Sequence, residues 1–302
     1  MNRQEELLSV IDFVRYANTV FNNENVFVGH GACDYWDEAI FMVLGYLSIP
    51  FDKFDLCKDA RLTDQEKFSI HQIISTRVQE RKPTAYLINK SWFCGLEFYV
   101  DDRVIIPRSP ISSMIKDGFS DYIKKDQSIS RILDLCSGSG CIGIAASYAF
   151  PDAEVDLVDI SEGALEVAQI NIEALDCLDI VTPIKSDLFS ELPVGLEYDI
   201  IISNPPYVDA EDLESMPEEF AHEPCLALDG GADGLDVVGG IIKESYKYLS
   251  DKGFLVLEVG NSMLRLESKY SNFNFDWIDF DGFSNGVVVL SKADLIALAD
   301  AV

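Results

Sequence analysis

The spacing of apolar residues divides the chain into a helical front part and a longer part in which strands and helices alternate. From residue 1 to about 82, apolar side chains recur at intervals of three and four residues, as they do on the buried face of a helix. Asp34 stands where an N-cap is expected, and Thr63-Asp64-Gln65-Glu66 has the pattern of a capping box. These signals predict a small helical bundle whose third long helix continues through Arg81 and is ended by Pro83.

Aromatic and β-branched residues dominate the stretch from Trp92 to Ile106, which is typical of strands. We expect a hairpin here, with its turn around Asp101-Asp102, joining the front part to the rest of the chain. Pro107-Arg108-Ser109-Pro110 then interrupts the pattern, and residues 111–125 read as a further helix. Arg108 is held between two prolines and is a candidate substrate or cofactor contact, although a surface charge at a kink is the alternative.

Short apolar runs bounded by turn residues alternate with helical patterns through the remainder of the chain. Such alternation is typical of a parallel sheet that helices cover on both faces. The predicted strands are 131–135, 154–159, 181–185, 198–203, 253–259, 277–280 and 287–290, the last two joined by a turn at 282–286. The fold class is therefore α/β: a seven-stranded doubly wound, Rossmann-like sheet with one antiparallel edge strand. The corresponding domains are residues 1–90 (helical), 91–110 (linking hairpin) and 111–302 (α/β).

The first strand of the sheet runs into a glycine-rich loop that opens a helix. Glycines let the backbone turn tightly and approach a ligand, and a helix N-terminus offers unpaired N–H groups. Gly138 to Gly143 matches the dinucleotide pattern G-x-G-x-x-G, so a nicotinamide cofactor has to be considered. Asp134 argues against a pyrophosphate at this loop, because a carboxylate disfavours phosphate and suits a cationic ligand.

The second and third strands also end in acids. Asp159 follows Gly140 by 19 residues and could accept both hydroxyls of a ribose, which suits NAD and S-adenosylmethionine alike. Asp187 could accept an adenine amino group, while Leu188 or Phe189 packs on the ring. Each acid alone could be a helix cap or a solvated strand end. Three acids at successive strand ends predict a nucleoside pocket.

The fourth strand, Tyr198 to Ser203, ends in Asn204-Pro205-Pro206-Tyr207. This position is the carboxyl end of a parallel strand, where open α/β sheets have their ligand crevice. Two prolines fix φ and remove two N–H donors, so the carbonyl groups of the turn are rigid acceptors. The Asn204 oxygen and the Pro205 carbonyl could each accept one hydrogen of an NH2 group. The turn therefore indicates a site for a planar nitrogen, with a merely stiff turn as the alternative.

A long loop is predicted at residues 209–235, beside the expected crevice, where a lid or binding loop is usual. His222-Glu223 suggests a general base, but an anchor for the loop fits these residues better. His30 and His71 in the front part are interpreted as structural. Helices are expected at 235–249 and 261–270.

The charge of the chain restricts its partners. Lys and Arg number 23 and Asp and Glu 52, which gives a formal charge of −29. Such a surface repels nucleic acid and attracts basic proteins, although it could also serve solubility alone. Seven cysteines without a C-x-x-C pair favour a reduced, intracellular protein without zinc. With no signal peptide and no membrane span in the sequence, we expect a cytoplasmic location.

Together these motifs resemble the HemK-type protein-glutamine methyltransferases, in particular the branch that acts on the third large-subunit ribosomal protein. The family features are Asp134-Leu-Cys-Ser-Gly-Ser-Gly140, Val158-Asp-Ile-Ser161, Ser186-Asp-Leu-Phe189 and Asn204-Pro-Pro-Tyr207. The branch features are Gly29-His-Gly31, Asp37-Glu-Ala39, Trp92-Phe-Cys-Gly95, Pro107-Arg-Ser-Pro110 and His222-Glu-Pro224. Ser113 departs from the family, where an acid is expected.

The resemblance implies methylation of a glutamine amide nitrogen (N5) with S-adenosylmethionine, substrate recognition by residues 1–90, and a methyltransferase domain at 111–302. It implies that Cys136, Ser137, Gly138, Ser139, Gly140, Asp159, Leu188 and Asn204 line the cofactor or substrate site. The strand-end argument adds Asp134 and Asp187 as cofactor contacts. Asn204 and Pro205 would orient the amide, and Pro206 and Tyr207 would wall it. A nucleic-acid amino-methyltransferase shares such turns and is the first alternative. A non-catalytic S-adenosylmethionine-binding scaffold is the second.

Overall fold

The computed structural model describes residues 7–280 and 283–299, which form two compact units. The first, called the helical unit, contains the described residues up to Ser91 together with Val100–Asp102 and Pro217–His222. The second, called the sheet unit, contains Trp92–Tyr99, Arg103–Met216 and the described residues from Glu223 onwards. The sequence placed a boundary at residue 90 but did not predict the two later segments of the helical unit.

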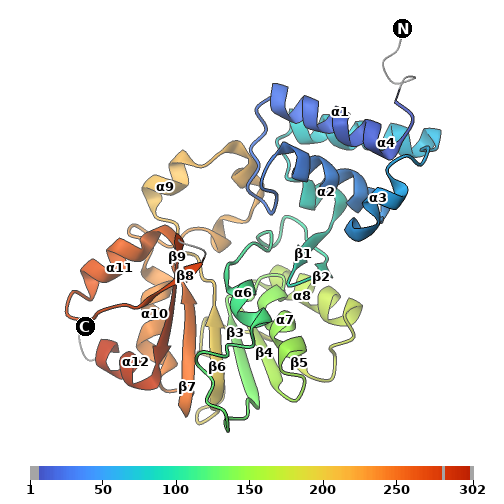
Figure 1. Cartoon of the computed structure of the whole chain (residues 1–302). Helices are drawn as coiled ribbons and strands as arrows, with labels where there is room; N and C mark the ends of the chain where they lie inside the picture. Colours follow the sequence, from blue (N-terminus) through green and yellow to red (C-terminus); the bar gives the residue numbers. More distant parts are fainter. Residues whose placement is uncertain (1–6, 281–282, 300–302) are drawn as a thin grey trace. The chain divides into compact units, whose positions relative to one another are not determined.

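The helical unit is built on three long helices, α1, α2 and α4 (Figure 1). Helices α2 and α4 begin at the capping residues that the sequence indicated. Asp34 accepts hydrogen bonds from the backbone of Trp36 and Asp37, and Thr63 and Glu66 form a reciprocal capping box. Apolar faces of α1, α2 and α4 meet in one core around Phe13, Phe21 and Met42. The elements are α1 Val10–Asn23, α2 Tyr35–Leu47, η2 Phe51–Lys53, α3 Phe54–Cys57, α4 Asp64–Gln79, α5 Thr84–Ile88 and the 3₁₀ turn η3 Glu218–His222.

Within the described residues, seven strands of the sheet unit form one sheet in the order β5-β4-β3-β6-β7-β9-β8. These strands are β3 Arg131–Leu135, β4 Glu154–Asp159, β5 Val181–Lys185, β6 Tyr198–Ser203, β7 Leu249–Glu258, β8 Trp277–Phe280 and β9 Phe283–Ser291. Strands β3 to β7 pair in parallel, and β9 runs antiparallel to both β7 and β8. A separate two-stranded sheet joins β1 Ser91–Phe93 to β2 Leu96–Phe98.

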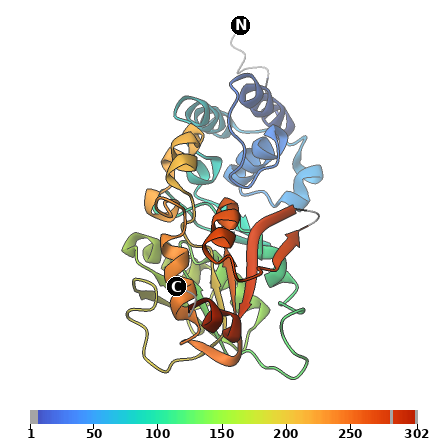
Figure 2. The ribbon, with the colours of Figure 1, turned by 90° about the vertical axis from the view of Figure 1, so that its left-hand side faces the viewer.

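Successive strand residues point to opposite faces of the large sheet, and here both sets are apolar. Helices therefore cover both faces. Ile132 and Ile200 pack with α6, α7 and α8, whereas Leu133 and Ile201 pack with α10, α11 and α12 on the other face. Figure 2 looks onto the sheet from the side of α10, α11 and α12. The helical segments are α6 Ile111–Lys116, α7 Cys141–Ala149, α8 Glu162–Ala174, α9 Ala210–Ser215, η4 Cys225–Ala227, α10 Asp236–Ser245, η5 Gly260–Ser262, α11 Met263–Lys269 and α12 Lys292–Ala299.

The strand order reverses between β3 and β6, which are neighbours in the sheet but not in the sequence. Leu135, the last residue of β3, is paired in register with Ser203, the last residue of β6, and the Ser203 hydroxyl donates to the Leu135 carbonyl (2.8 Å). The glycine-rich loop and the Asn204 turn therefore leave the sheet side by side. In a doubly wound sheet this switch point is where ligands bind.

The predicted α/β fold class is confirmed, with differences in detail. The reversed strand β9 lies one place in from the edge, because β8 pairs on its outer side. The first hairpin turns at Cys94-Gly95 rather than at Asp101-Asp102, with φ of 52° and 86° as two-residue hairpin turns require.

Three other predicted segments differ in length or content. Helix α6 ends at Lys116 instead of Lys125, since Gly118 and Phe119 have positive φ. The loop predicted at 209–235 contains α9, η3 and η4. Of the turn predicted at 282–286, Gly282 lies outside the described residues and Phe283–Gly286 belong to β9.

Candidate active site

A cavity of about 340 Å³ opens at the switch point of the sheet unit. One wall follows the carboxyl ends of β3, β4, β5 and β6, and the opposite wall comes from the chain after the hairpin and from the segment before α10. The lining residues are Arg103–Ile105, Cys136, Gly138, Val158–Ser161, Ala164, Ser186–Leu188, Asn204, Pro206, Pro224, Leu226, Ala227, Asp229, Asp236 and Val237. The cavity therefore joins residues of four strand ends that the sequence singled out separately.

Asp159 connects β4 to the glycine-rich loop. One carboxylate oxygen accepts from the backbone N–H of Gly138 (2.9 Å) and the other from that of Ser161 (2.8 Å). Burial raises the pKa of Asp159, and these backbone bonds oppose the shift. Each carboxylate oxygen can accept a further bond, so a residue in this position can bind two adjacent hydroxyls of a ribose.

Asp134 lies behind the loop instead of lining the cavity, where we expected it to meet a ligand. Its side chain is fully buried, and Oδ2 accepts from the Gly143 N–H (2.8 Å) at the start of α7. Oδ1 has no hydrogen-bond partner among the described residues. Burial raises the pKa of Asp134 to about 8, and the nearby Asp159 adds to the shift. The carboxyl group supports the loop from inside.

The residues of the glycine-rich loop divide into those that face the cavity and those that shape the loop. Cys136 and Gly138 line the cavity, whereas Ser137, Ser139 and Gly140 do not. Gly140 has φ of 76°, and a Cβ atom there would lie 2.8 Å from Leu157. Burial, together with the charges of Asp159 and Asp134, strongly raises the pKa of the Cys136 thiol. The thiol is therefore neutral and is not an activated nucleophile.

Asp187 and Leu188 both line the cavity after β5. The sequence left open whether Leu188 or Phe189 would contact an aromatic ring. Phe189 is buried and stacks on Tyr248, with ring centroids 4.7 Å apart, on the side of α10. Leu188 is thus the residue of this pair that can cover a flat ligand.

Asn204 and Pro206 line the cavity, and the buried Pro205 lies between them in the chain. In the described part of the chain, no protein donor bonds to the Asn204 side chain or to the Pro205 carbonyl. Tyr207 does not line the cavity, and its hydroxyl donates to Glu258 (3.0 Å). We predicted Tyr207 as a wall of the site, but its polar end is bound elsewhere.

Arg108 and Glu223 anchor the far wall of the cavity without lining it. Arg108 donates both guanidinium arms to Glu223 (2.5 and 2.8 Å), and Glu223 also accepts from the Ile106 N–H (3.0 Å). Pro224, the next residue, does line the cavity. Glu223 is thus an anchor of its loop, as predicted.

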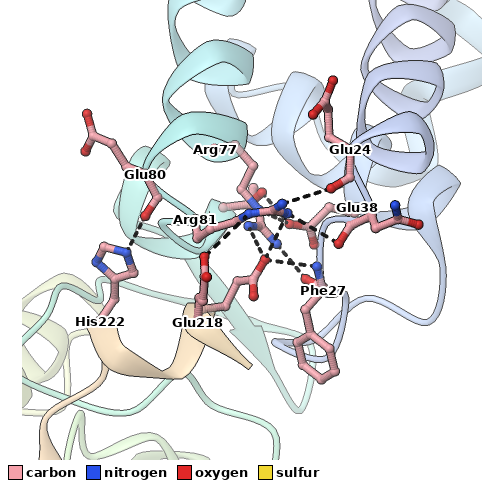
Figure 3. Close-up of polar contacts among 11 residues, drawn as sticks. Glu24, Phe27, Glu38, Arg77, Glu80, Arg81, Glu218 and His222 are labelled. Carbon is pink, nitrogen blue, oxygen red and sulfur yellow. Dashed lines mark hydrogen bonds and ion pairs between the residues drawn. The ribbon is translucent and has the colours of Figure 1, made fainter. Parts of the chain in front are cut away.

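His222 belongs to the helical unit, where Nε2 lies 2.7 Å from the Glu80 carbonyl (Figure 3). Beside it, Glu219 accepts from the buried Arg77 (3.3 Å) and from the Phe27 N–H (2.9 Å). Arg77 also donates to Glu38 (2.9 Å) and to the Phe27 carbonyl (2.6 Å). Figure 3 shows Arg77 of α4 and Glu38 of α2 close to Phe27 and to Glu218 of the 217–222 segment. His222 is a loop anchor here, as favoured from the sequence.

The two remaining histidines pack among aromatic rings, in keeping with structural roles. The ring centroids of His30 and Phe220 are 4.5 Å apart, and those of His71 and Phe13 are 5.0 Å apart. Among the described residues, no group of three or more His, Cys, Asp or Glu is placed to hold a metal. In the same part of the chain, no helix is long and apolar enough to cross a bilayer.

Sequence reasoning missed two residues that support the site and one that holds the helical unit together. Asn171 on α8 bonds to the Tyr99 backbone and to the Ser139 carbonyl (2.9 Å), which ties the hairpin to the glycine-rich loop. Glu258 binds Tyr207. Within the helical unit, Arg77 likewise holds the 217–222 segment. Glu258 ends an otherwise apolar run in β7, which was a signal in the sequence. Asn171 and Arg77 lie in helices that carry several other polar residues, so nothing in the sequence marked them.

Comparison with known proteins gives the same class of fold and matches nearly the whole chain. The family model described as Methyltransferase small domain matches residues 120–275. The ribosomal protein uL3 glutamine methyltransferase of Francisella tularensis is 43% identical to this chain. The alignment covers 98% of this chain and 94% of the Francisella protein. The ribosomal protein uL3 glutamine methyltransferase of Bordetella pertussis is 40% identical, and the alignment covers 97% of this chain and 98% of the Bordetella protein. The solved hMettl16 catalytic domain in complex with MAT2A 3′UTR hairpin 1 shares the fold: TM-score 0.50, 14% identity, 82% of this chain and 91% of that one.

Proposed function

Because the chain belongs to the family of ribosomal protein uL3 glutamine methyltransferases, we propose that it methylates a glutamine side chain of uL3 with S-adenosylmethionine. The observation that carries this proposal is the Asn204-Pro205 pair of acceptors at a nucleoside-type cavity. The acceptors and the cavity meet at the switch point of the sheet. A methyl donor and an amide could therefore be held next to each other.

The residues around the cavity fit the proposed cofactor. Asp159 has acceptor capacity for the ribose hydroxyls, and Asp187 offers a carboxylate for the adenine amino group. Leu188 supplies an apolar surface for the adenine ring, and Gly138 lets the backbone come close. When bound, S-adenosylmethionine supplies an electrophilic methyl group on a positively charged sulfur.

An amide nitrogen is a poor nucleophile because its lone pair is delocalised into the carbonyl. The Asn204 oxygen and the Pro205 carbonyl would each accept one N–H of the glutamine, which fixes the amide plane and aims the nitrogen. Orientation of this kind lowers a barrier by up to about 7–11 kcal/mol in well-aligned systems. As the nitrogen bonds to the methyl carbon, the carbon–sulfur bond would break and its electron pair would stay on the sulfur of the departing S-adenosylhomocysteine. The nitrogen, now positively charged, would release one N–H proton to water, so no strong base is required.

The charge of the chain supports a basic protein substrate. At −29 the surface attracts cationic proteins and repels phosphate backbones, so we propose no direct contact with nucleic acid. A ribosomal protein substrate also supports action in the cytoplasm. We further propose that the helical unit recognises the substrate, since none of its described residues lines the cavity.

Mass spectrometry of purified uL3 tests this function. After incubation with the protein and S-adenosylmethionine, intact uL3 should gain the mass of one methyl group, and peptide mapping should place it on a glutamine. A parallel reaction with ribosomal RNA should incorporate no labelled methyl. Labelled RNA together with unmodified uL3 would contradict the proposal and favour the nucleic-acid alternative. Tight cofactor binding with no product on either substrate would favour the scaffold.

A further inference from the structure

Tyr207, the last residue of the amide-binding turn, is partly buried and is closely approached by the backbone of two glycines. A Cβ atom at Gly260 would lie 2.4 Å from the Tyr207 ring, and one at Gly230 would lie 2.8 Å from its Cα. Real Cβ contacts are not this short, so both positions must remain glycine for the turn to keep its place. Gly260 also has φ of 47°, a conformation that side chains disfavour. The backbone at Gly230 and Gly260 therefore packs directly against Tyr207.

Two side chains bind the polar groups of Tyr207. Its hydroxyl donates to Glu258 Oε1 (3.0 Å), and its carbonyl accepts from the Ser262 hydroxyl (2.8 Å). Burial strongly raises the pKa of Tyr207, and the charge of Glu258 raises it further. The phenol therefore keeps its proton and remains a hydrogen-bond donor. The ring and both polar ends of Tyr207 are thus fixed by neighbours.

Glu258 is placed to hold two motifs at once. It is the last residue of β7, which pairs with β6 so that Leu257 lies opposite Ser203. Only 4% of Glu258 is exposed, and its second oxygen accepts from the Ser109 hydroxyl (2.5 Å). Ser109 lies in the Pro107–Pro110 segment, next to Arg108. One buried carboxylate therefore joins this proline segment to the Asn204–Tyr207 turn.

We propose that Glu258 is a positioning residue for methyl transfer, which holds the Asn204-Pro205 acceptors in place through the Tyr207 hydroxyl. This inference rests on the proposed function. Tyr207 is two residues from Pro205, and both intervening peptide groups flank a proline with fixed φ. A shift of Tyr207 is therefore transmitted to the Pro205 carbonyl. Misplacement by about 1 Å can cost about a hundredfold in rate.

The test compares Tyr207→Phe and Glu258→Ala with the unmodified protein, measuring kcat and KM on uL3 and the Kd for S-adenosylmethionine by calorimetry. We expect kcat to fall about 10- to 100-fold in both variants, with the cofactor Kd changed less than about twofold. Glu258→Gln should keep most of the activity, because its amide oxygen still accepts from Tyr207. The double variant Tyr207→Phe/Glu258→Ala should lose no more than the worse single variant.

The matched control is Glu267→Ala, which removes a similar bond to an aromatic donor, Trp277 Nε1 (2.7 Å), away from the cavity. Its kcat should stay unchanged. Normal kcat in Tyr207→Phe, additive losses in the double variant, or an equal loss in the control would overturn the role of Glu258. These outcomes leave the proposed function intact. Absence of methyl transfer by the unmodified protein would refute the proposed function, and this inference with it.

Discussion

At the scale of single residues, the acids of the site have different roles that depend on burial. Asp159 and Asp187 line the cavity, whereas Asp134 is buried under the glycine-rich loop. In sequence all three look alike, since each lies at or next to the carboxyl end of a strand. Side-chain direction decides the role, because neighbouring strand residues point to opposite faces. Solvent and ligand can reach Asp159, while the Asp134 carboxyl meets only protein.

The buried Asp134 gives a pH-dependent prediction. Its pKa in the folded protein is about 8, against an ordinary value of 3.8, so the folded state binds this proton more tightly than the unfolded state. Its contribution to stability is present below about pH 4 and is lost as the pH rises through about 8. The free energy of unfolding of Asp134→Asn, relative to that of the unmodified protein, should therefore increase as the pH rises from about 4 to about 8. The increase over this range should be at least about 1 kcal/mol. Urea unfolding of both proteins without cofactor measures the difference, and a gap that stays constant or narrows with pH would contradict the burial argument.

At the scale of elements, the 217–222 segment is part of the helical unit although it follows the Asn204 turn in the chain. Its attachment depends on Glu219, whose side chain is 4% exposed and bonds to Arg77, which is 1% exposed. These residues are 142 positions apart, so no local pattern could reveal the contact. The glycine-rich loop and the Asn204 turn were predictable, because an apolar run and its turn residues mark a strand end directly. The Cys94-Gly95 turn was missed because Asp101-Asp102 has the commoner turn composition.

Removing the Glu219 carboxylate should destabilise the helical unit. Glu219→Ala leaves Arg77 with one fewer buried partner, and breaking a buried pair costs about 3–5 kcal/mol. The adjacent Glu218→Ala is the control, because that side chain is 85% exposed and its loss should change the free energy of unfolding by at most about 0.5 kcal/mol. Denaturant unfolding of the full chain measures both. Equal effects of the two substitutions would show that the segment is not held by this cluster.

At the scale of the whole molecule, the charge of −29 should govern how the protein meets its substrate. Attraction between an acidic enzyme and a basic protein speeds encounter and is screened by salt, whose Debye length falls from about 10 Å at 0.1 M to about 3 Å at 1 M. We expect kcat/KM for uL3 to fall at least about tenfold over this range, with kcat little changed. Steady-state kinetics in sodium chloride tests this. A salt-independent kcat/KM would assign the acidity to solubility alone.

The sequence predicted the fold and one wall of the cavity, but the opposite wall required the structure. Residues 103–105 and 224–229 come from segments with no strand-end signal, and they reach the cavity through the Arg108–Glu223 pair and the chain before α10. The position of Tyr207 also required the structure. The motif predicted Tyr207 beside the amide, but its hydroxyl donates to Glu258. Motifs indicate which residues leave the sheet together. Packing between distant segments decides which of them face the ligand.

Single-turnover methylation of uL3 by Asn204→Ala, with cofactor binding measured on the same sample, tests whether the Asn204 turn orients the glutamine amide. We expect a rate at least about a hundredfold below that of the unmodified protein, because one of the two amide acceptors is lost. The Kd for S-adenosylmethionine should change little, and the exposed Asn274→Ala should react normally. A near-normal rate in Asn204→Ala would contradict the claim that this turn holds the amide.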